Sequence, residues 1–421
     1  MLKSELSRIF VAIPLMKELD NVPILLDQLI NQSMRPAFIS FCINQPESWR
    51  KLPDKKEIIL NNTKTLIYLN KLLDSFPIPI IVLDHSSPGN GFHSNVGCVG
   101  LARKLCIDSF LSFTNNNDII VNMDADTNYP DNYFENIFDI YSQLPLLSGV
   151  CAPYYHKIDN LPIDKARLML RYEIFLHYYT LQLLLIQSPY AYMPIGSAMS
   201  FRVNAYKKAG GFKVKDAGED FYTMQQIRKI GIISSWLDNT IYPAARISDR
   251  VVFGTGPAIG MNLENQIKKY PFYPTYLFKK IESYYQILEY SNSIDEIIKN
   301  LKDIIPEKII LKIYKNHTQR DKFIHAIHEY FDAFHILKFL NNNYSVEINN
   351  DFEFFKNFYE ELFKKNIIYK NWQEISIDEL NQIRDDLYEY ELDLHKSRFN
   401  FLVENKTNKK LWQNMAMLYD R

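Results

Sequence analysis

Glycine is missing from more than a third of this chain. All 13 glycines of the 421 residues fall between Gly89 and Gly260, and residues 261–421 contain none. Tight turns and close approach of the backbone to a ligand require glycine, so a region without it is expected to be mostly helical. We therefore predict two domains, one spanning residues 1–260 and a helical one spanning residues 261–421.

The chain also has almost no net charge, no CxxC pair and no long apolar run. Forty-eight basic residues against 49 acidic ones leave no bulk field that would favour nucleic acid. Residues 1–6 lack the apolar core of a signal peptide, and the apolar stretch 174–186 is too short to span a bilayer. No CxxC pair occurs, so we predict reduced thiols and a cytoplasmic protein without a transmembrane segment. The four cysteines are Cys42, Cys98, Cys106 and Cys151.

The residues between 118 and 127 give the clearest chemical signal. Ile119 to Met123 is a short apolar run typical of a buried strand, and Asp124 and Asp126 follow it at once. Open α/β sheets place ligands where strands end, and carboxylates supply the hard oxygens that Mg²⁺ or Mn²⁺ prefers. The segment indicates a divalent-metal site for a diphosphate, with a simple turn after a strand as the structural alternative.

The first domain alternates strands and helices, which predicts a parallel sheet. A glycine-rich loop, residues 87–97, runs into a helix that carries Arg103 and Lys104, and such loops let backbone amides approach phosphates or sugars. A long helix is expected over residues 163–188, whose end either packs on the sheet or contacts a membrane surface. The expected strands cover residues 8–14, 38–43, 78–83, 119–123 and 149–153.

A second acidic pair, Glu219 and Asp220, follows Gly218. Carboxylates at a helix start complement the helix dipole, which is the structural interpretation of this pair. The catalytic interpretation is that one carboxylate accepts a proton from a reacting hydroxyl.

Taken in order, the motifs of the first domain resemble those of family 2 glycosyltransferases, which have the GT-A nucleotide-sugar fold. The resemblance covers roughly residues 8–256 and implies an α/β fold with a mainly parallel central sheet flanked by helices, followed here by a mostly helical C-terminal region. The matching elements are Pro14 with Glu18, Asn95-Val96-Gly97, Asp124-Ala125-Asp126, Gly196-Ser197-Ala198-Met199-Ser200-Phe201-Arg202 with Gly210-Gly211-Phe212, and Glu219-Asp220.

The resemblance also implies roles for these residues. Asp126 would bind the Mn²⁺ or Mg²⁺ ion that bridges the donor diphosphate, and Asp124 would contact the ribose or the water shell of the metal. Asp220 would be the general base, and Glu219 would help to place the acceptor. The residues expected to bind the donor are Pro14, Glu18, Asn44, Asp84, Asn95, Lys104, Asp124, Gly196, Ser197 and Arg250.

The expected reaction is transfer of a sugar from a nucleotide-diphosphate sugar to an acceptor hydroxyl, with inversion if the family mechanism holds. Asn44-Gln45 stands where the family commonly has an Asp that recognises the base, so a UDP-linked and a GDP-linked donor both stay open. The Gln-x-x-Arg-Trp motif of processive synthases is absent after Asp220, which favours a non-processive enzyme. A nucleotidyltransferase of related fold and a non-catalytic nucleotide-sugar-binding module are the alternatives.

Two further features leave alternatives open. Arg246 or Arg250 would clamp the diphosphate beside a glycine-containing lid at residues 254–256, or this segment is a surface linker. In the second domain, His325, His328 and His335 with Asp332 have metal-site spacing, but they read more simply as the polar side of an amphipathic helix. That domain is expected to cover the acceptor, support a homo-oligomer or dock a partner.

Overall fold

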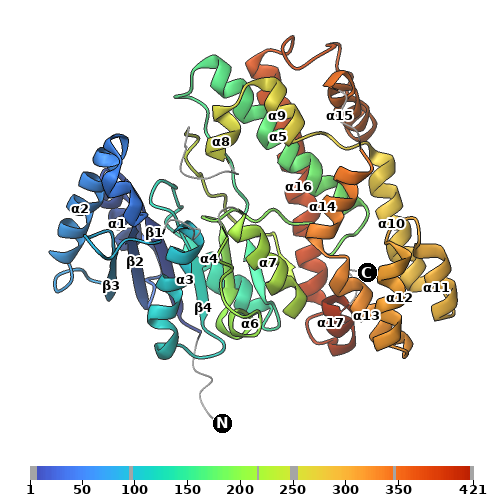
Figure 1. The fold of residues 1–421 in the computed structure, drawn as a ribbon, viewed down its shortest axis with the longest axis horizontal. Helices are drawn as coiled ribbons and strands as arrows, with labels where there is room; N and C mark the ends of the chain where they lie inside the picture. Colours follow the sequence, from blue (N-terminus) through green and yellow to red (C-terminus); the bar gives the residue numbers. More distant parts are fainter. Residues whose placement is uncertain (1–6, 94–97, 216–217, 247–254, 345–347, 418–421) are drawn as a thin grey trace. The chain divides into compact units, whose positions relative to one another are not determined.

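The computed structural model of the chain describes residues 7–93, 98–215, 218–246, 255–344 and 348–417. The chain forms two compact units (Figure 1). The first, which we call the sheet unit, comprises Met1–Asn160, Met193–Pro257 and Arg398–Lys406. The second, the helical unit, comprises Leu161–Tyr192, Ala258–Ser397 and Thr407–Arg421. The domain boundary expected at residue 260 stays a prediction; the compact units differ from it mainly in assigning Leu161–Tyr192 to the helical unit.

A seven-stranded sheet in the order β3-β2-β1-β4-β6-β5-β7 forms the core of the sheet unit. Strands β1 to β4 pair in parallel, β7 pairs in parallel with β5, and β6 runs antiparallel to both of its neighbours. The expected α/β class with a mainly parallel sheet is therefore confirmed. The strands are β1 (Ile9–Leu15), β2 (Phe38–Asn44), β3 (Ile80–His85), β4 (Ile119–Asn122), β5 (Gly149–Cys151), β6 (Met199–Arg202) and β7 (Ile233–Ser234).

Strand β1 is apolar almost throughout, because helices cover both faces of a parallel sheet and bury every side chain. Its residues Ile9–Ile13 are at most 2% exposed. The helices of the sheet unit follow the strands in alternation, as the sequence predicts. They are α1 (Asn21–Asn31), α2 (Lys56–Asn70), α3 (Cys98–Phe110), α4 (Tyr133–Gln143), α6 (Val203–Lys208) and α7 (Glu219–Ile230), with short 3-10 turns η1 (Glu47–Lys51), η2 (Pro53–Lys55) and η3 (Leu111–Phe113).

The strand order places a topological switch point between β1 and β4. From β1 the chain proceeds to β2 and β3 on one side, and it then crosses to β4 on the other side. The two strands are in register with Ala12 opposite Asn122, so their carboxyl ends meet at one edge of the sheet. Ligand crevices in open α/β sheets form at such a point. Glu18 follows β1 here, and Asp124 and Asp126 follow β4.

The helical unit is helical over nearly all of its described residues, which confirms the expectation for the glycine-free region. Helix α5 (Ile163–Leu185) is buried along most of its length, and Leu181 and Ile186 at its end are 0% and 2% exposed. That end therefore packs in a protein core, and the membrane-surface alternative for it is wrong. The other helices are α9 (Leu263–Lys269), α10 (Thr275–Tyr290), α11 (Ile294–Leu301), α12 (Glu307–Asn316), α13 (Arg320–Tyr330), α14 (Ala333–Asn342), α15 (Ile348–Phe363), α16 (Ile377–Glu404) and α17 (Lys409–Met417), while α8 (Thr255–Gly260) spans the boundary between the units.

Buried ion pairs join the helices of this unit. Arg171 of α5 lies 2.8 Å from Asp351 of α15, and both side chains are fully buried. Arg384 of α16 lies 2.8 Å from Glu173 of α5 in a similarly buried position. Among the residues that the structure describes, no helix is long and apolar enough to cross a membrane.

Candidate functional site

Three carboxylates lie just beyond the carboxyl ends of the central strands. Asp124 and Asp126 follow β4, and their side chains are 33% and 20% exposed. Glu18 precedes α1 and is 6% exposed. Its carboxylate accepts a hydrogen bond from the side chain of Asn21, the first residue of α1. The switch point therefore carries concentrated negative charge that remains partly open to solvent at Asp124.

Arg103 of α3 connects the two acidic motifs. Its Nη2 donates a hydrogen bond to Oδ1 of Asp124 at 2.8 Å, and its Nε lies 3.6 Å from Oε1 of Glu219. The guanidinium side chain is only 3% exposed. Burial by itself lowers the pKa of Arg103, but the charges of Asp124, Glu219 and then Asp220 outweigh it and raise the pKa. Residues almost a hundred positions apart in the sequence are thereby brought to a single site.

Gly196 leaves the space that the Arg103 guanidinium occupies. A Cβ atom at position 196 would lie 2.5 Å from Nη2 of Arg103, closer than real side-chain contacts allow. The sequence analysis expects this glycine beside the donor sugar, and that role stays a prediction. The structure gives it a local task, which is to admit a buried cation.

Tyr129 fixes the backbone around Asp124. Its hydroxyl accepts a hydrogen bond from the Asp124 backbone N–H at 2.9 Å and donates one to the carbonyl oxygen of Ser197 at 3.1 Å. Tyr129 is 2% exposed, and burial together with the charge of Asp124 holds the pKa of its phenol well above the usual value. The aspartate motif and Ser197 are therefore held in a fixed relation.

Glu219 and Asp220 begin helix α7, where Gly218 adopts a left-handed conformation with φ of 70°. The Asp220 carboxylate accepts a hydrogen bond from the backbone N–H of Phe221 at 2.7 Å. Glu219 is 7% exposed. Burial first, and then the charge of Asp220, raises the pKa of Glu219 above the ordinary glutamate value. Burial also raises the pKa of Asp220, so the pair holds a proton more tightly than free carboxylates do.

Arg246 binds the other half of the site. Its guanidinium lies 2.6 Å from Oδ2 of Asp126 and forms an ion pair with Glu18 as well. Burial lowers the pKa of Arg246, but the charges of Asp126 and Glu18 outweigh that effect and raise it. The sequence analysis names Arg246 as one candidate for a diphosphate clamp, and the structure places it against the expected metal ligand.

The carboxylates of the site suit a divalent cation that would also be coordinated by a diphosphate. Five carboxylates face two guanidinium groups, Arg103 and Arg246, so the site has excess negative charge. Magnesium-type ions are commonly held by one or two carboxylates and completed by substrate phosphates and water. Asp124 and Asp126 are of that kind, and Asp124 keeps the larger exposed surface. Within the described residues, no group of three or more His, Cys, Asp and Glu side chains is arranged to hold a metal by itself. The five carboxylates are those of Glu18, Asp124, Asp126, Glu219 and Asp220.

Asn44 and Asp84, both expected to bind the donor, have structural partners at the ends of β2 and β3. The Asn44 amide is 2% exposed and donates to the carbonyl oxygens of Leu15 and Cys42. Burial would raise the pKa of Asp84, but hydrogen bonds from Ser86 and Ser87 lower it to about 2. Their donor-binding roles stay predictions.

The glycine-rich loop binds a carboxylate of the chain itself. The backbone N–H groups of Gly89 and Gly91 donate to Glu47 at 3.2 and 2.9 Å. These amides are the ones the sequence analysis expects to approach phosphate. Two other donor-binding candidates, Asn95 and Arg250, lie outside the described residues, as does Gly254 of the expected lid. Thr255 and Gly256, the rest of that segment, begin helix α8.

Lys104 and Pro14 complete the expected set. Lys104 forms an ion pair with Asp108 one turn further along α3, with more than a third of each side chain exposed. Pro14 is half-buried within β1, opposite Cys42 of β2. Within the described residues, Lys104 makes no hydrogen bond or ion pair with the carboxylates that surround Arg103, and its assignment to the donor stays a prediction.

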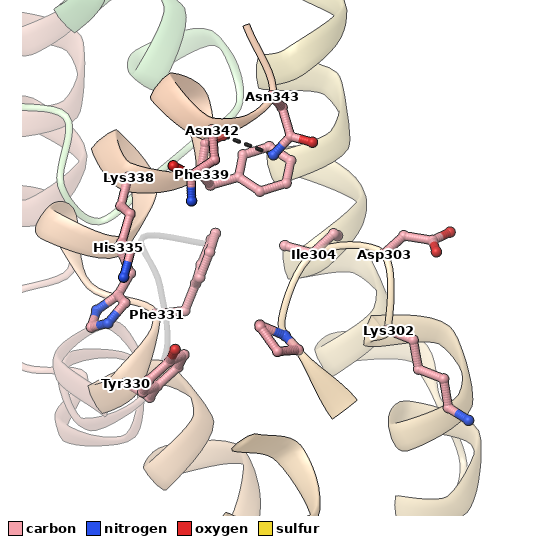
Figure 2. Close-up of a pocket in the computed structure, with 11 residues that line it drawn as sticks. Lys302, Asp303, Ile304, Tyr330, Phe331, His335, Lys338, Phe339, Asn342 and Asn343 are labelled. Atoms are coloured by element: carbon pink, nitrogen blue, oxygen red, sulfur yellow. Dashed lines mark hydrogen bonds between the residues drawn. The ribbon is translucent and has the colours of Figure 1, made fainter. Parts of the chain in front are cut away.

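A cavity of about 310 Å³ lies in the helical unit and is lined by residues between Lys302 and Asn343 (Figure 2). Its wall includes His335, whose ring lies 4.2 Å from that of Tyr330 and 2.9 Å from the Asp332 carboxylate. Helix α13 ends at Tyr330, and Asp332 is the N-cap of the next helix, α14. The expectation of one helix carrying all the histidines is therefore wrong. His328 is 7% exposed and bonds to the Tyr284 hydroxyl, so it is not on a polar outer face.

No protein-family model and no curated protein sequence matches this chain. Among solved structures, it matches TarS 1-349 from S. aureus in complex with UDP-GlcNAc, with 11% identity and a TM-score of 0.37, over 93% of this chain and 92% of that one. It also matches the mannosyltransferase PcManGT from Pyrobaculum calidifontis in complex with GDP-Man and Mn²⁺, with 11% identity and a TM-score of 0.36, over 97% and 88%. The structural match extends over most of the chain at low identity.

Proposed function

We propose that this protein is a metal-dependent glycosyltransferase that moves a sugar from a nucleotide-diphosphate sugar to an acceptor hydroxyl. The observation that carries the proposal is the position of Arg103, which contacts Asp124 of the first acidic motif and Glu219 of the second. A transferase needs carboxylates for a metal-bound diphosphate and a separate carboxylate for the acceptor. The Arg103 contacts bring candidates for both tasks to one end of a parallel sheet.

Asp220 takes the proton of the acceptor hydroxyl as that oxygen attacks the anomeric carbon. The new glycosidic bond forms while the bond to the diphosphate oxygen breaks, and the nucleoside diphosphate leaves with the electron pair. A raised pKa suits a carboxylate that must accept a proton near neutral pH. Glu219 lies next to this base, contacts Arg103 and helps to place the acceptor.

Asp126 and Asp124 hold the diphosphate end of the donor. A divalent ion bound there would neutralise the negative charge that develops on the leaving diphosphate. Arg246, which contacts Asp126 and Glu18, supplies a second positive charge beside that position. Direct displacement by one base inverts the anomeric configuration, so we propose an inverting and non-processive reaction.

The decisive experiment compares two variants for donor binding and turnover. Asp220→Asn keeps the side-chain size but cannot accept the proton, so turnover should fall roughly 10²-fold or more while donor affinity survives. Asp126→Ala should weaken donor binding mainly when Mn²⁺ is present. Asp139→Asn, on the exposed side of α4, is the matched control and should change neither quantity.

Screening by thermal shift with UDP- and GDP-linked sugars, with and without Mn²⁺, identifies the donor first, because a ligand that binds the folded state raises its melting temperature. Near-normal turnover of Asp220→Asn would exclude this residue as the base. Release of pyrophosphate from a nucleoside triphosphate would instead identify a nucleotidyltransferase. Binding of nucleotide sugar without any transfer, across a panel of acceptors, would point to a binding module.

A further inference from the structure

Helix α2 has two opposite faces, of which one is buried against the sheet. The buried face consists of Ile58, Asn62, Thr65 and Leu69, spaced by four, three and four residues. A second stripe, spaced by four, four, three and four residues from Lys56, lies on the outer face of the helix. This outer stripe consists of Lys56, Leu60, Lys64, Ile67 and Lys71, which directly follows the helix.

The outer stripe exposes large apolar side chains to solvent. Leu60 and Ile67 are 55% and 52% exposed, and Leu52 before the helix and Leu73 after it are 41% and 43% exposed. Four of the sixteen large exposed apolar side chains found among the described residues thus fall within residues 52–73. Such local concentration is typical of a surface that meets an apolar phase.

The lysines of the stripe are available for a partner, whereas two acidic residues close to Lys56 already have lysine partners. Glu57 pairs with Lys17 at 3.0 Å, and Asp54 pairs with Lys55 at 3.3 Å. Lys56, Lys64 and Lys71 form no ion pair with any residue in the described part of the chain. The stripe therefore combines uncompensated positive charge with exposed aliphatic side chains.

We propose that the outer face of α2 docks the sheet unit on an anionic membrane surface. Lysines alternating with aliphatic residues along one helix face bind in the plane of a bilayer, with the aliphatic side chains at the acyl boundary and the ammonium groups at anionic headgroups. A protein partner with an acidic groove would use the same charges, but it would not need lipid. The contact is reversible, because three lysines and two aliphatic side chains provide far less binding than an embedded helix.

The test measures partitioning of the full-length protein onto vesicles by sedimentation. Vesicles of phosphatidylglycerol mixed with phosphatidylcholine should bind the protein, and pure phosphatidylcholine vesicles should bind it much less. Binding should weaken as salt is added, because salt screens exposed charges. Equal binding to both kinds of vesicle, or to neither, would overturn the proposal.

Three variants separate the contributions. Replacing Lys56, Lys64 and Lys71 by Gln should reduce partitioning on the order of 100-fold, since each lysine near an anionic surface contributes roughly fivefold. Leu60→Ser with Ile67→Ser should reduce it roughly tenfold, because the apolar contact is lost. Replacing Lys207, Lys208 and Lys280, three exposed lysines elsewhere, by Gln removes the same charge and should have little effect.

The two α2 variants together also discriminate the kind of partner. If the lysine variant loses binding and the Leu60 and Ile67 variant keeps it fully, the stripe binds anionic groups by charge alone, which would overturn the placement of its aliphatic side chains at the acyl boundary. All substituted side chains are exposed, so each variant should keep the melting temperature of the parent protein, and a melting curve checks this. The measurement requires no sugar transfer, so its outcome is separate from that of the proposed catalytic function.

Discussion

The guanidinium of Arg103 reaches Oδ1 of Asp124 at 2.8 Å from a position that is almost completely buried. Asp126, two residues further on, is instead bound by Arg246 at 2.6 Å. The two aspartates of one short motif are thus held by different cations, one deep in the unit and one nearer solvent. This arrangement predicts that the two arginines contribute differently to folding and to ligand binding.

Arg103→Met should destabilise the protein by about 3 kcal/mol at neutral pH, because removing one partner of a buried ion pair leaves the other charge uncompensated. Urea denaturation at pH 7 measures the change. Measured from alkaline pH downward, the loss should shrink as Glu219, whose pKa is raised by burial, takes up its proton. A loss that is independent of pH would mean that the Arg103 side chain acts through packing alone.

Gly196→Ala should reproduce much of the Arg103 effect, because the new Cβ would lie 2.5 Å from Nη2 and force the guanidinium away from Asp124. A double-mutant cycle measures the dependence of one change on the other. Adding Gly196→Ala to Arg103→Met should cost far less than adding it to the natural sequence. Purely additive free energies would show that Gly196 serves a task unrelated to Arg103.

Glu219→Gln should gain stability relative to the natural sequence as pH rises. Burial raises the folded-state pKa of Glu219 above its usual value of 4.5, so the folded state holds the proton more tightly than the unfolded chain does. This contribution to stability is full below the unfolded pKa and is lost as pH rises through the folded one. Glutamine carries no such dependence.

Melting temperatures of both proteins across this pH range test the sign. Glu264 on α9 offers a matched control, because its hydrogen bond with Lys268 lowers its pKa. Glu264→Gln should therefore leave the difference nearly constant across this range, because a lowered pKa places that group's contribution below it. A melting temperature of Glu219→Gln that falls relative to the parent as pH rises would contradict the assigned pKa direction.

The sequence predicts five of the seven strands, because their apolar runs are short and bounded by polar residues. It gives no strand at β6 or β7, which are only four and two residues long. It selects Asp124, Asp126, Glu219 and Asp220 as candidate site residues through motif spacing, and their roles stay predictions. What spacing cannot supply is the partner of each carboxylate, since Arg103 and Glu219 meet only after α3 and α7 pack. Contacts of that kind depend on tertiary structure alone.

A local signal for Arg103 does exist in the sequence. Arg103 shares an apolar helical stripe with Cys106, Ile107 and Phe110, all of which are buried, whereas Lys104 falls off that stripe. An arginine on an apolar stripe indicates a buried ion pair, because an unpaired buried charge is too costly. The neighbouring lysine, which the sequence analysis selected for donor binding, meets Asp108 at the surface instead.

For the histidine-containing residues 323–335, the sequence pattern is clear but predicts the wrong helix boundaries. Its periodicity is continuous across residues 323–335, so it predicts one helix. However, the side chain of Asp332 accepts a hydrogen bond from the backbone N–H of His335 and starts a new helix there. N-cap residues end one helical register and begin another, and an Asp three residues before a polar side chain is too common to mark such a break unaided.

Arg246→Gln should strengthen the binding of Mn²⁺ by the protein in the absence of nucleotide. Arg246 and a divalent cation draw on the same carboxylate, that of Asp126, and removing the guanidinium also leaves Glu18 with less positive charge nearby. Loss of one unit charge within contact distance of the ligand should tighten Mn²⁺ binding by roughly tenfold or more. Calorimetric titration with Mn²⁺ alone measures this without any turnover.

Arg35→Gln is the matched control, because it removes the same charge from an exposed position just before β2, at the opposite edge of the sheet. It should leave Mn²⁺ affinity unchanged. Equal or weaker Mn²⁺ binding by Arg246→Gln would show that the arginine and the metal do not compete, and that Asp126 does not hold the ion.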